Sequence, residues 1–432
     1  DRVAAALPAD GALVELIAYA DRPLVPVPGA PETEPPGTLR YLALVLFPDA
    51  RIRPVDLGPA APIDAATARL RAALTRRDAA YLAPAQALHQ LVFRPLAAVL
   101  GSTGRVFLAP DGQLALVPFD ALHDGRRFVI DAFDITYLTS GKDLLPRPLE
   151  VPASVSVVVV ADPDFGARVP AAPPTPRGEL LAERGPSAGL SSSALRELGE
   201  RSWGPLPGTR QEAESLRRLF PQAKVFVAED ATKDRLLHVT APGILHIATH
   251  GFFLEDATAP ADARGVVQVQ GAASGLGPRR PPDPLLRSGL VLAGAQARES
   301  GAEPAQPRVE SSLATALELA GLDLWGTQLV VLSACDTGRG DVKLGQGVYG
   351  LRRALVVAGA ETVVMSLWKV NDGTTRALME DYYRHLLAGE GRTAALREAM
   401  LSLRQLHPHP HFWAPFISLG KDAPLGTQAG GG

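Results

Sequence analysis

The run VSVVVVA at residues 155–161 constrains the fold of this chain more than any other feature of its sequence. A nearly unbroken apolar run of this length is typical of a strand that is covered on both faces, as in a parallel sheet. From here on, short apolar runs alternate with segments of helical periodicity. Further strands are expected at residues 224–228, 243–248, 328–333 and 362–366, and helices at 209–220, 232–239, 311–320, 347–358, 374–387 and 393–406. This alternation predicts crossover connections and a mostly parallel α/β sheet.

The residues before this block have the pattern of a smaller β-rich and helical region. Strands are expected at residues 11–19, 38–47, 51–57, 105–109 and 128–138, and helices at 63–76 and 77–100. The later stretches 166–208, 255–283 and 296–310 contain few large apolar residues and are expected to be mobile insertions. We therefore expect a β-rich linking segment at residues 1–80, a second N-terminal part at 81–150, the α/β domain at 151–420 and a loose tail at 421–432.

Composition excludes several classes of function. The 432 residues include 43 Lys and Arg against 46 Asp and Glu, so no basic surface for direct nucleic-acid binding is expected. No apolar run approaches the roughly 20 residues that span a bilayer, and no signal peptide is visible, so we expect no membrane contact. The single cysteine excludes an intramolecular disulfide framework and a Cys-rich metal site, and it predicts a reducing, cytoplasmic location. Because the chain begins with Asp1, we expect it to be a piece of a longer protein.

Two of the expected strands end in reactive residues. His250 follows the strand at 243–248, and Cys335, the only cysteine, follows the strand at 328–333. In open α/β sheets, binding sites form beyond the carboxyl ends of the strands. If the two strands are neighbours, a thiol faces an imidazole, which is the minimum for nucleophilic acyl transfer.

Each residue has a chemical role in this interpretation. The Cys335 thiolate attacks a carbonyl carbon, and the His250 imidazole keeps the thiol poised or protonates the leaving amine. The backbone N–H groups of Gly251 and Cys335 donate to the developing oxyanion, where one donor is worth about 2.7–4 kcal/mol. The competing interpretation is structural packing, since free cysteine is among the most buried residue types. We assign His246, inside its strand, to packing.

Two further motifs suggest little chemistry. The HPHPH run at 407–411 has no carboxylate or thiol beside it, so a structural role is expected rather than a metal site. The Gly-rich stretch 338–350 lacks the Lys-Ser/Thr pair of a P-loop, so phosphate binding is not expected. The sequence thus predicts neither a metal nor a cofactor.

Several ordered motifs resemble the CHAT family of caspase-like cysteine peptidases and, more distantly, the separases. The resemblance spans roughly residues 81–420. Its motifs are LAPDGQLALVPFDAL at 108–122, PLPGTRQEAESL at 205–216, AEDATKDRL at 228–236, HIATHG at 246–251, SGLVLAGA at 288–295, LVVLSACDTGRG at 329–340, GVYGLRRALVVAGAETVVMSLWKVND at 347–372 and ALREAM at 395–400.

This resemblance implies a caspase-type three-layer α/β/α sandwich in which the His and Cys motifs end adjacent strands. It implies a catalytic dyad of His250 and Cys335. Members of the family commonly carry tetratricopeptide repeats before this region, so an N-terminal repeat region or a regulatory protein is the implied partner.

The resemblance also bears on specificity. The acid of separases that corresponds to Asp372 looks like the floor of a pocket for a basic residue, so Asp372 is expected to pair with Arg or Lys before the scissile bond. The alternative is that Asp372 caps the helix expected to start near Thr374. Asp336, beside the nucleophile, is a weaker substrate-binding candidate, and the Arg279–Arg280 pair is a candidate self-cleavage site.

The sequence therefore predicts a cysteine endopeptidase that acts on a protein substrate, with cleavage after a basic residue as a finer expectation. Two alternatives stay open. One is a non-catalytic protein-interaction module on a peptidase fold, because fold alone does not fix function. The other is an acyltransferase or peptide ligase that uses the same dyad.

Overall fold

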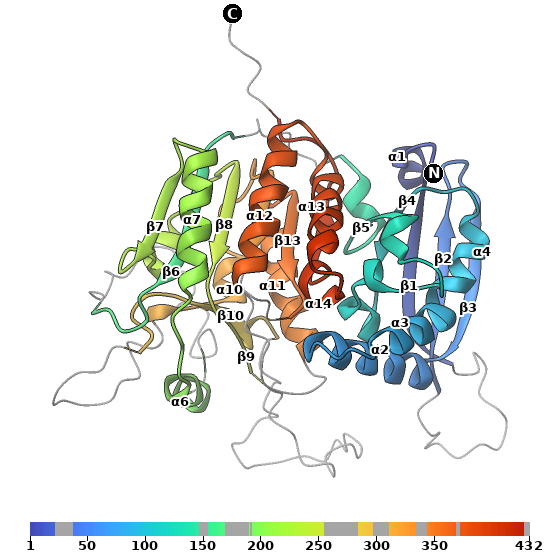
Figure 1. Ribbon diagram of the computed structural model, residues 1–432, viewed down its shortest axis with the longest axis horizontal. Coiled ribbons are helices and arrows are strands. Elements are labelled where there is room, and N and C mark those ends of the chain that lie inside the picture. Colours follow the sequence, from blue (N-terminus) through green and yellow to red (C-terminus); the bar gives the residue numbers. More distant parts are fainter. Residues whose placement is uncertain are drawn as a thin grey trace, which may run out of the picture.

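A large mixed sheet runs through the whole molecule (Figure 1). The computed structural model describes residues 1–21, 38–146, 154–168, 190, 192–254, 284–296, 311–333, 344–368 and 372–426. The 11 strands lie in the order β3-β2-β1-β4-β5-β14-β13-β12-β8-β6-β7. Their bounds are β1 Gly11–Asp21, β2 Thr38–Leu46, β3 Ile52–Pro59, β4 Arg105–Ala109, β5 Asp134–Tyr137, β6 Val157–Pro163, β7 Lys224–Ala228, β8 Ile244–Ala248, β12 Leu329–Leu332, β13 Thr362–Ser366 and β14 Phe416–Gly420.

The half of the sheet from β13 to β7 is parallel, as the sequence predicts. β12 pairs in parallel with both β8 and β13, and β6 pairs in parallel with β8 and β7. All residues of β8, β12 and β13 are buried, because helices cover both faces of this half. The antiparallel pairs are β1–β2, β2–β3 and β13–β14.

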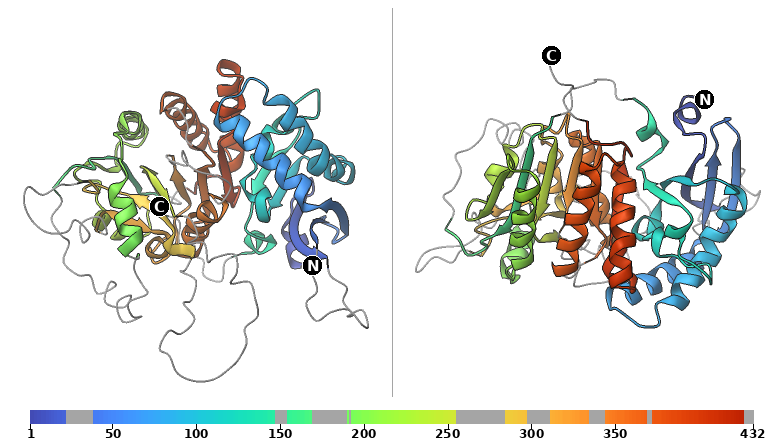
Figure 2. Two further views of the ribbon diagram at one scale, coloured as in Figure 1. Left: turned by 90° about the horizontal axis from the view of Figure 1, so that it is seen from below. Right: turned by 45° about the horizontal axis from the view of Figure 1, so that its top comes forward.

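Helices lie on both faces of the parallel half and complete three layers, which confirms the predicted α/β/α sandwich. The helices α7, α12 and α13 lie side by side over one face, and α11 lies over the other (Figures 1 and 2). These helices are α7 Pro207–Leu219, α11 Leu344–Ala358, α12 Asp372–Leu387 and α13 Arg392–Leu406. The shorter helices of this half are α6 Ser192–Glu200, α8 Lys233–Leu237, α10 Ala316–Leu319 and α14 Pro410–Trp413.

The N-terminal half extends the same sheet with β1 to β5. Its helices α2 and α4 pack on β2 and β3. Their bounds are α1 Arg2–Ala6, α2 Ala60–Thr75, α3 Leu82–Leu88 and α4 Arg94–Leu100, with a π-helical turn at His89–Phe93 between α3 and α4. The sheet is therefore continuous across the expected boundaries at residues 80 and 150, and those boundaries stay predictions.

A second, three-stranded sheet lies beyond the carboxyl ends of the parallel strands. It consists of β9 Gly251–Phe253, β10 Ser288–Val291 and β11 Leu313–Thr315, in the order β11-β10-β9. The sequence predicts a helix over residues 311–320, and this is wrong for its first half. Pairing with β10 holds residues 313–315 extended, and the Thr315 hydroxyl then caps α10 by accepting from the Glu318 N–H.

Two other local expectations are also corrected. A single strand is expected at 128–138, but the chain turns at Val129–Asp131 because the Asp131 carboxylate accepts from the Phe128 N–H. A helix is expected from residue 77, yet α3 starts only at Leu82, after a turn in which the Asp78 carboxylate accepts from the Ala80 N–H. In both places a short acidic side chain bonds to nearby backbone, which favours a turn over a regular element.

In the part of the chain that the structure describes, no helix is long and apolar enough to cross a membrane.

Candidate functional site

The strands that precede the two candidate catalytic residues are neighbours in the sheet. In the parallel pairing of β8 with β12, Ile247 lies opposite Leu332, and the Ser333 N–H still donates to the Ile247 carbonyl at 3.0 Å. His250 is the third residue after Ile247, and Cys335 is the third residue after Leu332. In sequence, both residues therefore follow the Ile247–Leu332 pair of the β8–β12 ladder by three positions. Cys335 and Asp336 lie outside the described residues, as does the Arg279–Arg280 pair.

His250 is held firmly at the carboxyl end of β8. Its side chain is 4% exposed, and its ring lies between two aromatic rings, with centroids 5.3 Å from Phe165 and 5.6 Å from Trp203. Its Nε2 lies 2.8 Å from the carbonyl oxygen of Gly204. A carbonyl oxygen only accepts hydrogen bonds, so this contact assigns the proton to Nε2 and makes Nδ1 the nitrogen that can take up another proton.

The two rings that contact His250 belong to a satellite hydrophobic cluster. It joins α6, the loop before α7 and the three-stranded sheet, and its buried members are Phe165, Leu195, Leu198, Trp203, Leu206, Phe252, Val291, Ala295 and Leu313. The sequence places residues 166–208 in a mobile insertion, and for residues 192–208 this is wrong. Composition showed few large apolar residues there, but those present pack together against β9, β10 and β11.

Gly251 follows His250 at the start of β9. It lies opposite Leu290 in the antiparallel pairing with β10, next to a pair in which the Val291 N–H donates to the His250 carbonyl. Hydrogen-bonded and non-bonded pairs alternate along such a ladder, so the Gly251 N–H points away from β10. A Cβ at Gly251 would lie 3.6 Å from the Gly289 carbonyl oxygen, an ordinary contact. Packing among the described residues therefore does not demand glycine here, whereas room for a substrate would.

A chain of buried polar groups crosses the interior at His246, four residues before His250 in the sequence. His246 in β8 is fully buried, and its Nδ1 lies 2.9 Å from the Tyr383 hydroxyl on α12. Its Nε2 lies 3.0 Å from Oε1 of Glu212 on α7, a mainly electrostatic contact because the N–H does not point along the hydrogen-bond direction. The Ser333 hydroxyl donates to Oε2 of Glu212 at 3.0 Å. Burial raises the pKa of Tyr383 well above its usual range. His246 is thus buried, but in a polar network that the sequence does not predict.

Asp372, the expected specificity residue, is the first residue of α12. One carboxylate oxygen accepts a hydrogen bond from the Gly208 N–H at 3.3 Å, in the first turn of α7. A Cβ at Gly208 would lie only 2.1 Å from the Asp372 Cβ, so the two helix ends are in direct contact. The carboxylate therefore satisfies a backbone donor of a neighbouring helix, and Asp372 stays partly exposed.

The helix α7 and the loop before it connect all these groups. Gly204 contacts His250, Gly208 contacts Asp372, and Glu212 contacts Ser333, the first residue after β12. The sequence identifies this segment only as the PLPGTRQEAESL motif. Gly208 and Glu212 are four residues apart on α7 and so lie on one face of the helix, which was the available signal, whereas Gly204 lies in the loop before it.

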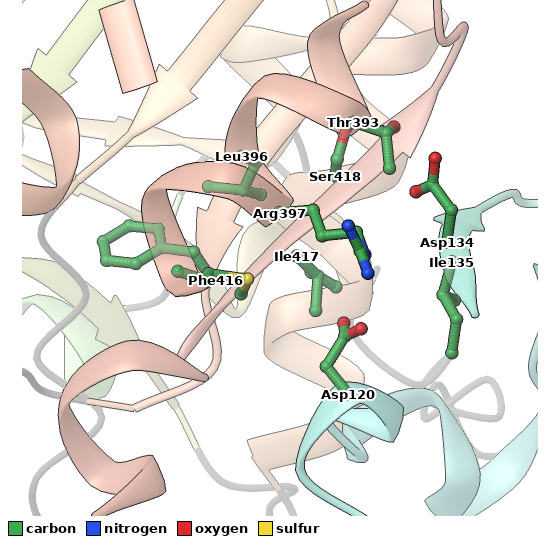
Figure 3. Close-up of a pocket in the computed structure, with 10 residues that line it drawn as sticks. Asp120, Asp134, Ile135, Thr393, Leu396, Arg397, Phe416, Ile417 and Ser418 are labelled. Atoms are coloured by element: carbon green, nitrogen blue, oxygen red, sulfur yellow. Dashed lines mark hydrogen bonds between the residues drawn. The ribbon is translucent and has the colours of Figure 1, made fainter. Parts of the chain in front are cut away.

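A second group of titratable residues lies far from this site, at the junction of the N-terminal half with β14 and α13 (Figure 3). Burial and the nearby Asp134 carboxylate raise the pKa of Asp120 to about 7, and burial raises the pKa of Asp134 to about 6. The Arg397 guanidinium lies between them and donates to the Ile130 carbonyl at 2.8 and 3.1 Å. The cavity that they line holds about 10 Å³, which is room for one water and excludes a substrate.

A much larger cleft of about 990 Å³ lies at the opposite ends of the strands. Its lining includes Trp325, Gly326 and Glu361, which precede β12 and β13. It is therefore remote from His250. Among the described residues, no group of three or more His, Cys, Asp or Glu side chains is placed to hold a metal. The HPHPH run packs against the end of α2. There the Nδ1 atom of His411 lies 2.9 Å from the Leu74 carbonyl oxygen.

Comparison with known proteins gives the chain a family. The CHAT domain profile matches residues 82–421. Tetratricopeptide repeat protein 28 from Homo sapiens is 27% identical over 369 residues, which cover 82% of this chain and 14% of that protein. The Mus musculus protein of the same name is 27% identical as well, so the chain spans about 14% of the length of these curated relatives.

Among solved structures, the Saccharomyces cerevisiae separase–securin complex matches with a TM-score of 0.48 and 10% identity, over 97% of this chain and 30% of that one. The Arg-specific cysteine proteinase gingipain R from Porphyromonas gingivalis matches with a TM-score of 0.41 and 9% identity, over 84% of this chain and 74% of that one. The profile match covers more than three quarters of the sequence and confirms the resemblance in its motifs. The chain belongs to the CHAT domain family.

Proposed function

We propose that this chain is a cysteine endopeptidase in which Cys335 is the nucleophile and His250 is the acid–base partner. The observation that carries the proposal is the register of β8 and β12, in which Ile247 pairs with Leu332 and each candidate residue follows three positions later. Neighbouring parallel strands are about 4.8 Å apart, so two residues at equivalent positions beyond their ends are well placed to interact. The Gly204 carbonyl supports the role of His250, because it leaves Nδ1 as the proton acceptor.

The reaction follows from these assignments. Nδ1 of His250 takes the Cys335 thiol proton, and the thiolate attacks the carbonyl carbon of a peptide bond. The Gly251 N–H, turned away from β10, donates to the oxyanion that forms. As the C–N bond breaks, His250 returns its proton to the leaving amine and a thioester remains. Water then attacks the thioester, releases the acid product and restores the thiol; an amine in place of water gives ligation.

Asp372 is our candidate for recognising a basic side chain before the scissile bond. Its carboxylate is partly exposed at the start of α12, which follows the strand β13 beside β12. One of its oxygens accepts from the Gly208 N–H, and a carboxylate oxygen can accept more than one hydrogen bond. An Arg guanidinium is therefore the ligand that this group fits best. Asp336 stays a weaker candidate.

The substrate is proposed to be a protein, and regulation is proposed to come from a tetratricopeptide repeat region or a separate regulatory protein. The curated relatives carry the repeat in their names, and the match covers only 14% of their length. A reducing location such as the cytoplasm agrees with the single cysteine of the chain.

A non-catalytic interaction module is the second candidate. The observation that favours it is the burial of His250, whose side chain is 4% exposed between Phe165 and Trp203.

Turnover of internally quenched peptides with a central Arg separates the two candidates. We expect cleavage by the wild-type chain and a loss of at least ~100-fold in His250→Ala, the scale of general acid–base catalysis. Cys335→Ala should be inactive. His238→Ala is the matched control, because this histidine is exposed at the end of α8 and should leave turnover unchanged. Equal turnover in the wild type and Cys335→Ala would remove the enzyme proposal.

A further inference from the structure

Glu212 is a buried carboxylate that the proposed chemistry does not use. It lies on α7, is 3% exposed and faces the sheet. Its two oxygens serve two different strands. Oε2 accepts a hydrogen bond from the Ser333 hydroxyl at 3.0 Å, beyond β12, and Oε1 lies 3.0 Å from Nε2 of His246 in β8.

The contacts of this network agree with a His246 tautomer that carries its proton on Nε2. The Tyr383 hydroxyl donates to Nδ1 of His246, which leaves the His246 proton on Nε2, facing Glu212. Ser333 donates its hydroxyl proton to the other carboxylate oxygen. The carboxylate accepts the hydrogen bond of the Ser333 hydroxyl and attracts the His246 N–H electrostatically, without a hydrogen bond to it.

The place of Ser333 in the chain makes this contact matter. Ser333 is the first residue after β12, and its own N–H donates to Ile247 of β8 at 3.0 Å. Cys335 follows it two positions later in the sequence. Glu212 thus fixes the point at which the chain leaves the sheet toward the nucleophile. The segment before α7 also supplies Gly204, which bonds to His250.

We propose that Glu212 is a positioning residue, which acts through Ser333 to set where the Cys335 thiol stands relative to His250. This inference rests on the proposed function, because it assigns Glu212 a role only if the two residues form a dyad. The alternative is a buried pair that merely stabilises the packing of α7 on β8.

Two variants address the contact from its two sides. Glu212→Gln keeps the size of the side chain but turns one acceptor oxygen into an N–H donor, which opposes either the His246 N–H or the Ser333 hydroxyl. Ser333→Ala removes only the hydroxyl and leaves Glu212 beside His246. If Glu212→Gln does not fold, Ser333→Ala tests the same contact alone.

The readout is the alkylation rate of Cys335 by iodoacetamide, measured from pH 5 to 10 by intact mass. Cys335 is the only cysteine of the chain, so each adduct reports on this thiol. Because the thiolate is the reactive form, the midpoint of the profile gives the pKa of the thiol in place. We expect a wild-type midpoint below the ordinary value of about 8.5, since an imidazolium stabilises a thiolate.

In Glu212→Gln and Ser333→Ala we expect the midpoint to rise by about one pH unit, and the rate at pH 6.5 to fall about tenfold. The direction is diagnostic. Loss of a nearby negative charge would by itself favour the thiolate and lower the midpoint of Glu212→Gln, whereas a displaced thiol raises it. Ser333→Ala changes no charge and should move the midpoint in the same direction.

Glu361→Gln is the matched control for general damage to a buried charged network. Glu361 binds the buried Arg392 at 2.9 Å, and Arg392 also bonds to Gln328 directly before β12, at the opposite end of the same strand. This variant should lower the melting temperature without moving the alkylation midpoint. A midpoint unchanged in Ser333→Ala, or shifted equally in Glu361→Gln, overturns the positioning role.

The same experiment separates this inference from the proposed function. A midpoint that rises in His250→Ala but not in Ser333→Ala or Glu212→Gln leaves the dyad intact and refutes only the role of Glu212. An ordinary midpoint in the wild type that His250→Ala leaves unchanged refutes the dyad, and with it the positioning role.

Discussion

A backbone carbonyl holds His250 in place, and such an acceptor does not titrate. The Gly204 carbonyl oxygen accepts a hydrogen bond from the Nε2–H of His250 and has no ionisable group of its own. The orientation of the ring therefore does not depend on the ionisation of that partner. The covering rings of Phe165 and Trp203 restrict the ring further. At the scale of single residues, a backbone carbonyl and two aromatic rings help to orient His250, whereas Asp372 and Glu212 accept hydrogen bonds through their carboxylates.

Asp372 allows a substitution that removes charge but keeps the structural hydrogen bond. In Asp372→Asn the side-chain oxygen can still accept from the Gly208 N–H, so the melting temperature should change little. If Asp372 recognises a basic side chain, kcat/KM for Arg peptides should fall at least ~10-fold relative to otherwise identical Gln peptides. An Asn variant that keeps the full Arg preference would contradict the pocket role.

Gly251 provides a second residue-scale prediction. A Cβ at this position makes only ordinary contacts with described neighbours. The free energy of unfolding of Gly251→Ala should therefore be within about 0.5 kcal/mol of the wild-type value. Peptide turnover should nevertheless fall about 10-fold or more, because the methyl group lies beside the N–H that is proposed to bind the oxyanion. Denaturant unfolding and turnover, measured on the same preparations, check both halves. Unchanged turnover would place the substrate elsewhere.

At the scale of elements, α7 and the loop before it contact β8, the end of β12 and α12. Its contact with α12 is the tightest of these, since a Cβ on Gly208 would lie 2.1 Å from the Asp372 Cβ. A glycine in the first turn of α7 thus allows its close contact with α12.

Gly208→Ala tests this docking. In an open helix position the change would stabilise by about 0.5–1 kcal/mol, because alanine reduces the entropy of the unfolded chain. Here the clash should dominate and lower the free energy of unfolding by about 1–3 kcal/mol. In an Asp372→Gly background, Gly208→Ala should not lower the free energy of unfolding. Denaturant unfolding of the wild type, the two single variants and the double variant measures this coupling. Additive effects of the two changes would contradict a direct contact.

Local pattern predicts the strands of the parallel half well, because β6, β8, β12 and β13 are buried on both faces and leave continuous apolar runs. It fails where long-range pairing decides. The three residues of β11 lie in a segment with helical periodicity, and only Gly251 of β9 belongs to the His250 motif. Neither strand exists without β10 between them.

In the candidate site, too, some features have local sequence signals and others depend on long-range contacts. The positions of His250 and Asp372 at element ends follow from sequence, because apolar strands and helix starts have local signals. Their partners do not. Gly204 lies 46 residues from His250, and Glu212 lies 121 residues from Ser333, so only the packing of α7 on the sheet brings them together.

At the scale of the whole molecule, one sheet joins the N-terminal half to the half with the candidate site. The junction is narrow, because β5 and β14 pair only at Tyr137 and Leu419. Side chains from α13 strengthen it. Arg397 bonds to the Ile130 carbonyl, and Arg404 forms an ion pair with Asp131 at 2.5 Å.

Asp120 makes the stability of this junction depend on pH. Its pKa is about 7 in the folded protein, against 3.8 for the ordinary group, so between these values the folded state binds more protons than the unfolded state. The stabilisation is complete below about pH 4 and is lost as pH rises through 7, with a magnitude of up to ~4 kcal/mol.

Asp120→Asn should therefore raise the melting temperature at pH 8 relative to the wild type and have a much smaller effect at pH 4.5. Thermal unfolding at the two pH values checks this expectation. Asp21→Asn is the control for the loss of one negative charge, since this carboxylate is exposed at the end of β1. A variant that is less stable than the wild type at pH 8 would contradict the assignment.

Covalent labelling by an Arg-directed peptidyl acyloxymethyl ketone tests the central claim most directly, because this reagent needs both a positioned thiol and an active dyad. Intact mass should show one adduct on the wild-type chain and none on Cys335→Ala. Labelling of His250→Ala should be at least ~100-fold slower. An unlabelled wild-type chain, or a His250→Ala chain that is labelled as fast as the wild type, would contradict the claim that Cys335 and His250 act together.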